Sequence, residues 1–126
     1  MRLWAVWGYD SMFGGLHGME ETAIIEGTED EAREWGIELS ESVINSYSEI
    51  ADYLEERIKE ECEFNDINYY EDEDGVWSIR EQIYDEDIEF EYVELDISKL
   101  PTFDIQTLEE MFYNDKEEFL DNYRLN

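Results

Sequence analysis

Histidine and cysteine, the side chains best suited to catalysis near neutral pH, occur once each in this sequence. His17 lies among glycines in segment 14–18, and Cys62 lies in a helical pattern. A catalytic base needs a nucleophile and an orienting partner at a recognisable spacing, and the sequence offers neither. We therefore expect His17 to be a loop residue that makes a hydrogen bond. We predict no catalytic residue and no enzymatic activity.

Residues 70–81 hold the pattern closest to a metal site. They align with a twelve-residue calcium loop that has acids at positions 3 and 5, Gly75 at position 6 and Glu81 at position 12. Position 1, where such a loop requires aspartate, is Tyr70, and the flanking residues favour strands. An acidic hairpin turn explains the segment more simply. A calcium-binding module at 70–81 stays an outside alternative, and we expect no metal and no cofactor.

Carboxylates dominate the composition. The sequence has 37 Asp and Glu against 8 Lys and Arg, a net charge of −29. Solubility needs far less charge, so the excess indicates either a function or an adaptation to high salt. We expect salt adaptation to favour aspartate, whereas glutamate outnumbers aspartate by 25 to 12. We expect no direct nucleic-acid binding, because it depends on Lys and Arg, and anionic membranes should repel the chain.

The composition also predicts a folded chain. Hydrophobic residues make up 42% and aromatic residues 15%, too many for a disordered acidic tail. A length of 126 residues suits one domain, 1–126. The single cysteine excludes an intramolecular disulfide, no apolar run approaches the ~18 residues of a membrane span, and the N-terminus lacks a signal-peptide pattern. We expect a cytoplasmic protein.

The charge is distributed unevenly along the sequence. The first nineteen residues carry no net charge, whereas the remaining residues carry all of the −29. The neutral segment contains Trp4 and Trp7, which we expect to be core residues of a strand. It also contains Tyr9, Met12 and Phe13, which would form an aromatic anchor for a partner if they lie in an exposed loop. This anchor is the alternative to binding through the carboxylates.

Several segments have the composition of strands. Residues 2–7 and 22–25 predict two strands that form a hairpin across the glycine-rich loop 8–18. Residues 67–70 and 76–84 predict a second hairpin, joined by an acidic turn.

A further strand is predicted over residues 88–97. Its apolar residues change face at Tyr92–Val93, which indicates a β-bulge or a twist that moves the strand to a new neighbour. Same-face residues of a strand lie about 6.6 Å apart, given a rise of about 3.3 Å per residue. The strand therefore predicts short ladders of fixed negative charge, formed by Glu89 with Glu91 and by Glu94 with Asp96.

Two regions predict helices. Thr28 and Glu31 form a capping box, and apolar steps of three and four then predict a helix over about 29–62, either unbroken or bent near Ser46–Ser48. A C-terminal helix follows Pro101. The predicted fold class is α+β: a mostly antiparallel sheet of about four or five strands, packed against one long helix, plus a C-terminal helix.

Carboxylates held on helices and strands can occupy the basic groove of a nucleic-acid-binding protein. The acidic surface that we predict to bind such a partner lies on the long helix, the acidic turns and the last strand. Its residues are Glu55, Glu56, Glu60, Glu61, Asp72, Glu73, Asp74, Asp85, Glu86, Asp87, Glu89, Glu91, Glu94 and Asp96.

In size, charge, aromatic content and mixed helix–strand pattern, the chain resembles the acidic DNA-mimic inhibitors encoded by bacteriophages, such as anti-restriction and anti-CRISPR proteins. The resemblance is one of composition and is carried by segments 55–63, 70–75 and 84–96. It implies a non-enzymatic inhibitor of a basic host protein, a nuclease or other nucleic-acid-binding protein, in the host cytoplasm. The alternative is an acidic adaptor or inhibitor that docks through the neutral aromatic segment without mimicry. The oligomeric state is not encoded in any pattern that we identify.

Overall fold

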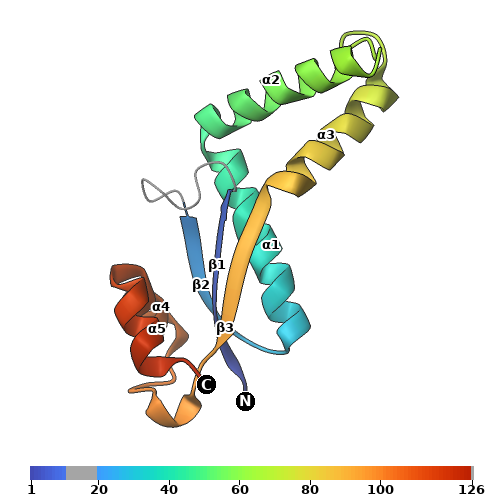
Figure 1. Ribbon diagram of the computed structural model, residues 1–126. Helices are drawn as coiled ribbons and strands as arrows, with labels where there is room; N and C mark the ends of the chain where they lie inside the picture. Colours follow the sequence, from blue (N-terminus) through green and yellow to red (C-terminus); the bar gives the residue numbers. More distant parts are fainter. Residues whose placement is uncertain (11–19, 126) are drawn as a thin grey trace.

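The chain folds into a small antiparallel sheet with helices on both faces and a helical hairpin that projects from one end (Figure 1). The structure is a computed structural model that describes residues 1–10 and 20–125. Its elements are β1 (Leu3–Asp10), β2 (Glu20–Glu26), α1 (Glu29–Ser46), α2 (Ser48–Phe64), α3 (Glu73–Asp87), β3 (Ile88–Glu94), the 3₁₀ helix η2 (Ile97–Lys99), α4 (Ile105–Asn114) and α5 (Lys116–Tyr123).

The sheet has the order β2-β1-β3, with β1 antiparallel to both neighbours. Trp7 lies opposite Thr22 on one side and opposite Glu91 on the other. The predicted α+β class and the first hairpin are confirmed. The prediction of four or five strands is wrong, because three strands form the sheet within the described part of the chain.

Both faces of the sheet are covered. Trp4, Val6 and Ala23 pack with residues of α1 on one face. Trp7 and Ile24 pack on the other face, with residues of α4 and α5. Trp4 and Trp7 are therefore core residues, as predicted.

Both explanations predicted for Tyr92–Val93, a bulge and a twist that moves the strand to a new neighbour, are wrong. The register of β1 with β3 runs without interruption from Trp4 opposite Glu94 to Asp10 opposite Ile88. Both faces of the sheet are covered. Apolar residues of β3 therefore pack against core residues whichever face they point to. No slip in the strand is needed.

Helix α1 lies unusually close to the sheet. A Cβ atom built on Gly8 would lie 2.3 Å from the backbone nitrogen of Ser40, and one on Gly36 would lie 2.3 Å from the ring of Phe90. Glycine at these two positions allows the backbone of α1 to approach the strands. The contact fixes α1 across β1 and β3.

Ser40 connects α1 to the two strands beneath it. Its hydroxyl donates to the carbonyl of Tyr9 at 2.5 Å and accepts from the amide of Glu89 at 3.0 Å. Tyr9 and Glu89 are partners in the ladder. A buried serine therefore takes part in the backbone hydrogen bonding of the sheet, which satisfies its own hydroxyl.

The predicted long helix is two helices. The capping box of Thr28 and Glu31 is present at the start of α1, and the chain becomes extended at Tyr47, between α1 and α2. Of the two versions predicted from the sequence, the bend near Ser46–Ser48 is confirmed. The bend directs α2 away from the sheet (Figure 1).

The second predicted hairpin is wrong, because most of its residues form α3. The Asp72 side chain accepts a hydrogen bond from the amide of Gly75 at 3.0 Å and so caps the helix. Val76 and Ile83 lie on the same face of α3, and both are buried against α2. Burial of this face outweighs the strand propensity of the segment.

The chain returns from α3 to the sheet and then to a pair of short helices. Asp115 interrupts the predicted C-terminal helix: its carboxylate accepts from the amide of Glu118 at 3.1 Å and starts α5. The amide of Leu125 finally donates to the carbonyl of Glu94 at 2.8 Å. The two ends of the described chain thus lie together at the end of the sheet opposite the helical hairpin (Figure 1).

Candidate functional site

The helical hairpin concentrates the negative charge. We call residues 48–87, which comprise α2, the connecting turn and α3, the arm, and the rest of the chain the body. The 40 residues of the arm hold 16 acids and 3 bases, a net charge of −13. The 86 residues of the body hold 21 acids and 5 bases, a net charge of −16. The arm therefore carries one net charge for about every three residues, against one for about every five in the body.

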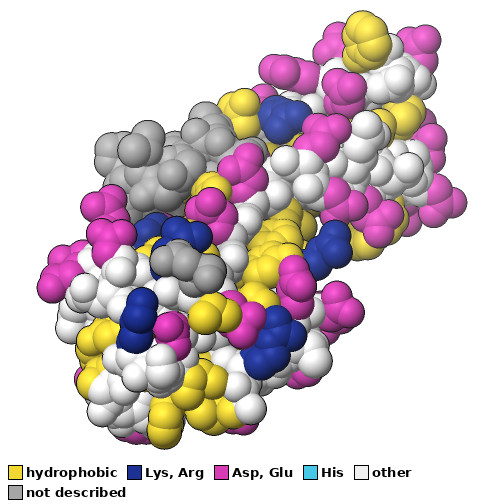
Figure 2. Space-filling view, turned by 60° about the horizontal axis from the view of Figure 1, so that its bottom comes forward, with side chains coloured by type: hydrophobic (Ala, Val, Ile, Leu, Met, Phe, Trp, Pro, Cys, Tyr) yellow, Lys and Arg dark blue, Asp and Glu magenta, His cyan; other side chains and the backbone are white. Residues whose placement is uncertain are grey.

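Most carboxylates of the arm face solvent. Fourteen of the sixteen acidic side chains are exposed. The predicted binding residues in this exposed group are Glu56, Glu60, Glu61, Asp72, Glu73, Asp74, Asp85 and Glu86. Figure 2 shows acidic side chains spread over the arm, with few cationic groups among them.

Two residues of the predicted acidic surface are not exposed to solvent to the same extent. Asp87 is buried at 1% exposure where α3 meets the sheet, and Glu55 is half-buried between the two helices of the arm. The sequence analysis placed Glu55 on the outer face of the long helix and Asp87 in an acidic turn at 84–87. In the structure a polar cluster engages Glu55, and Asp87 is the last residue of α3 and is buried.

We call that polar cluster the latch: Glu55, Tyr69 and Arg80. The Glu55 carboxylate accepts a hydrogen bond from the Tyr69 hydroxyl at 2.5 Å and one from the Arg80 guanidinium at 2.5 Å. Burial acts to raise the pKa of Glu55, but the two hydrogen bonds outweigh burial and hold the pKa below its usual value. The latch joins α2 to the turn and to α3, so it fixes the two helices relative to each other.

The other cations of the arm lie in exposed pairs. Arg57 is 3.5 Å from Glu86, and Lys59 is 3.9 Å from Glu56. Pairs of this exposure contribute little to stability and leave most of the field of the surrounding carboxylates in place. The negative surface of the arm is therefore only slightly neutralised from within.

The carboxylates of β3 separate into two groups. Glu89 and Glu91 are exposed and share the face of the sheet that bears Trp7 and Tyr9. Glu94 lies on the opposite face, so the acids of β3 do not form one continuous row. The predicted ladder is present only for Glu89 and Glu91.

Glu94 and Asp96 have structural partners in the body. Arg2 donates to Glu94 at 2.8 Å and lowers the pKa of that carboxyl. Asp96 also accepts from the hydroxyl of Ser98 at 2.6 Å, which lowers the pKa of Asp96, and it caps η2 by accepting from the amide of Ser98 at 3.1 Å. The ammonium group of Lys99 lies 3.8 Å from the Asp96 carboxylate. These contacts make both residues weaker candidates for binding a partner than the carboxylates of the arm.

The predicted aromatic anchor is only partly described. Tyr9 is half-buried in β1, and its pKa is raised by burial and then by the charges of Glu91, Glu89 and Glu20. Met12, Phe13 and His17 lie outside the described residues.

Exposed aromatic side chains are a feature of the arm that the sequence analysis missed. Phe64 and Tyr70, near the connecting turn, are each 84% exposed, Trp77 on α3 is 60% exposed and Tyr53 on α2 is 40% exposed. The sequence pattern could have indicated two of these exposed residues, because Tyr53 and Phe64 lie off the apolar face of α2. The exposure of Tyr70 and Trp77 was not predicted, because the sequence analysis assigned both residues to a hairpin. Figure 2 shows hydrophobic side chains at the free end of the arm.

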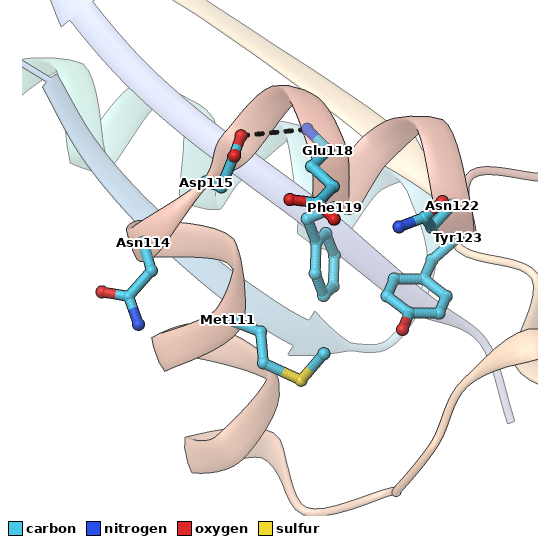
Figure 3. A pocket seen from close by; sticks show the side chains of 7 residues that line it. All are labelled: Met111, Asn114, Asp115, Glu118, Phe119, Asn122 and Tyr123. Atoms are coloured by element: carbon cyan, nitrogen blue, oxygen red, sulfur yellow. Dashed lines mark hydrogen bonds between the residues drawn. The ribbon is translucent and has the colours of Figure 1, made fainter.

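A pocket of about 310 Å³ lies between α4 and α5 in the body (Figure 3). Phe119, Tyr123 and Met111 line it, together with polar residues that include Glu118. Asp115, a second carboxylate of the lining, caps α5. The lining offers no histidine, cysteine or cationic side chain, and we assign it no chemistry.

The calcium alternative does not fit the backbone. Residues from Glu73 onward are helical, so Asp74 and Glu81 cannot wrap around an ion as the acids of a twelve-residue loop do. Within residues 1–10 and 20–125, no group of three or more His, Cys, Asp or Glu side chains is placed to hold a metal ion.

Among the described residues, no helix combines the length and the apolar character required to cross a membrane. No protein-family model, curated protein or solved structure matches this chain.

Proposed function

We propose that this chain is a non-enzymatic inhibitor whose arm occupies the basic groove of a host nucleic-acid-binding protein, such as a nuclease, in place of the nucleic acid. The observation that carries the proposal is that fourteen exposed carboxylates lie on one packed helical hairpin, which projects away from the body (Figure 1). An acidic loop would have to be ordered on binding. The packed hairpin is ordered beforehand, which lowers the entropic cost of association.

The charge density of the arm supports the proposal. Helix α2 has 17 residues, which at about 1.5 Å per residue gives a length of about 25 Å. Duplex DNA carries one phosphate charge for about 1.7 Å of axis, or about 15 charges over that length. The arm holds 16 carboxylates and a net charge of −13. Its charge thus matches that of a duplex segment of the same length.

The exposed aromatic side chains would add apolar contacts, which carboxylates alone do not make. Rows of charge accelerate and orient encounter, whereas buried aromatic residues contribute much of the binding energy at protein interfaces. Trp77 and Tyr84 line a shallow, mostly apolar depression of about 320 Å³ on α3, beside Arg80 and Glu81. Arginine side chains of a basic groove stack readily on such rings.

The proposal is tested with two matched variants in capture from host lysate. The arm variant carries Glu56→Gln, Glu60→Gln and Glu61→Gln. The control carries Glu34→Gln, Glu38→Gln and Glu41→Gln on α1. All six residues are exposed, and each variant loses three charges.

The arm variant is expected to lose binding of the captured partner by about tenfold or more, because fixed charges at the contact are removed. The control should bind within about twofold of the unaltered chain, because only the general field changes. Equal losses in both variants would show that the partner senses net charge rather than the arm.

A further inference from the structure

Hydrogen bonds near the C-terminal end of β3 show which of its backbone groups point to the outer edge of the sheet. Near the C-terminus, the amide of Asp96 donates to the carbonyl of Tyr123 at 2.7 Å, and the carbonyl of Glu94 accepts from Leu125 at 2.8 Å. The backbone groups of successive residues in a strand point to alternate sides. The N–H and C=O of Phe90 and Tyr92 therefore point to the same outer side as those of Glu94.

These groups form an open stretch of sheet edge. The segment 123–125 pairs with β3 only as far as Glu94. Beyond it, no residue of the described chain donates to or accepts from the outward groups of Phe90 and Tyr92. The edge at β2 differs, because in its middle the amide of Ile24 is bonded to the carboxylate of Glu109 on α4 at 3.3 Å. An unpaired edge of this kind is a template for an added strand.

The side chains around the open stretch define what such a strand would carry. Glu89 and Glu91 are exposed on one face, and the rings of Phe90 and Tyr92 are stacked on the other, with centroids 6.2 Å apart. Residues directly opposite each other in an antiparallel pair lie about 4.5–5.5 Å apart at Cβ. Cationic residues opposite the two glutamates and apolar residues opposite the two rings would therefore complement this edge.

A second copy of the chain does not fit the edge. Outward-facing residues must pair with outward-facing residues, so antiparallel pairing of two β3 strands with Phe90 opposite Tyr92 places Glu91 opposite Glu91. Like charges directly opposite each other are destabilising, and each copy carries a net charge of −29. The edge therefore favours a basic partner over self-association.

We propose that the open edge of β3 at Phe90–Tyr92 is a strand-addition site for an extended segment in which basic and apolar residues alternate. The added strand would hydrogen-bond to the backbone of Phe90 and Tyr92, with Lys or Arg beside Glu89 and Glu91. The site lies on the body and does not depend on the function proposed for the arm.

The test uses a seven-residue peptide of alternating lysine and valine, blocked at both ends, and the ¹⁵N-labelled full chain. Binding should slow hydrogen exchange at the amides of Phe90 and Tyr92 by about tenfold or more, because both become hydrogen-bonded. N-methylation of the valines, whose amides face β3, should weaken binding by about tenfold. N-methylation of the lysines, whose amides face away, is the matched control and should change affinity by less than about twofold.

A pair of protein variants checks the role of charge. Glu89→Gln with Glu91→Gln should weaken peptide binding several-fold, whereas Glu117→Gln with Glu118→Gln on α5 should not. Equal affinity for the two methylated peptides, or unchanged exchange at Phe90 and Tyr92 on binding, would overturn the proposal. Protection of these two amides without peptide, together with a dimer in sedimentation equilibrium, would instead assign the edge to a second copy.

Discussion

The body and the arm differ in how much of each element is covered by the rest of the chain. In the body, both faces of the sheet are covered, and strand residues as large as Trp4 and Trp7 are buried. In the arm, each helix buries a single stripe, and large aromatic residues such as Phe64 and Trp77 stay in solvent. The body also exposes aromatic rings, such as Tyr113 at 78% exposure, so the two regions differ in how their elements are covered and not in having exposed rings. We therefore expect the stability of the fold to depend mainly on the body, and we propose that the arm is the main surface for recognition.

The largest expected effect is a core truncation in the body. Phe112 is fully buried, and its ring contacts those of Trp7 at 5.8 Å and Phe119 at 5.2 Å between centroids. Phe112→Ala should lower the free energy of unfolding by about 3–5 kcal/mol, measured by urea denaturation. Tyr113→Ala, at a neighbouring exposed position, is the control. A loss below about 1 kcal/mol in Phe112→Ala would contradict the view that the body depends on packing.

A smaller loss is expected where α1 approaches the sheet. Gly36→Ala places a methyl group against the Phe90 ring, so it should destabilise the chain by about 1–3 kcal/mol through overpacking. Glu38→Ala, on the exposed side of the same helix, should change the unfolding free energy by less than about 0.5 kcal/mol. Similar values for the two variants would show that α1 does not lie as close to the sheet as described.

The latch should respond to both mutation and pH. Glu55→Gln removes the charge that accepts from Tyr69 and Arg80 and should cost about 1 kcal/mol, reduced from the value of a buried charged hydrogen bond because the side chains are about one-third exposed. Glu56→Gln, an exposed neighbour, is the control.

The pKa of Glu55 is lower in the folded chain than its usual value of 4.5. Its stabilising contribution is therefore complete above pH 4.5 and is lost as the pH falls through the lowered folded-state pKa. The difference in unfolding free energy between the unaltered chain and Glu55→Gln should shrink over that range. A difference that stays constant down to pH 2 would contradict a charged latch.

The smallest effect is expected for the ion pair of Arg2 and Glu94. Arg2 is half exposed, so Glu94→Gln should change the unfolding free energy by less than about 0.5 kcal/mol at moderate salt, measured by thermal and urea denaturation. A loss above about 1.5 kcal/mol would indicate that this corner of the body is held by charge rather than by packing.

The accuracy of the sequence predictions differed between the same two regions. The capping box at Thr28, the bend near Ser46–Ser48 and the first hairpin were predicted because each has a local signal. The strand count and the nature of residues 73–87 were not. Val76, Ile79 and Ile83 are spaced by three and four residues, which fits one face of a helix, whereas residues 76 and 79 cannot share a face of a strand. This helical spacing was missed, and in the structure all three residues pack with residues of α2.

The candidate site was predicted in part. Eight of the predicted carboxylates are exposed on the arm, because charged residues off an apolar stripe face solvent in most arrangements. The engagement of Glu55, the burial of Asp87 and the contacts of Glu94 depend on residues distant in the sequence. The projection of the arm also depends on tertiary packing, so the sequence pattern could not indicate which acidic face stands away from the body.

The central claim, that the arm takes the place of nucleic acid in a basic groove, is tested most directly by competition. The captured partner is first bound to a fluorescent DNA duplex of about 20 base pairs, and this chain is then added while fluorescence anisotropy is recorded. The anisotropy should fall to the value of free DNA as the chain saturates the partner. The arm variant Glu56→Gln/Glu60→Gln/Glu61→Gln should require about tenfold more protein for the same effect. An anisotropy that rises, with partner, DNA and chain present in one complex, would contradict the claim.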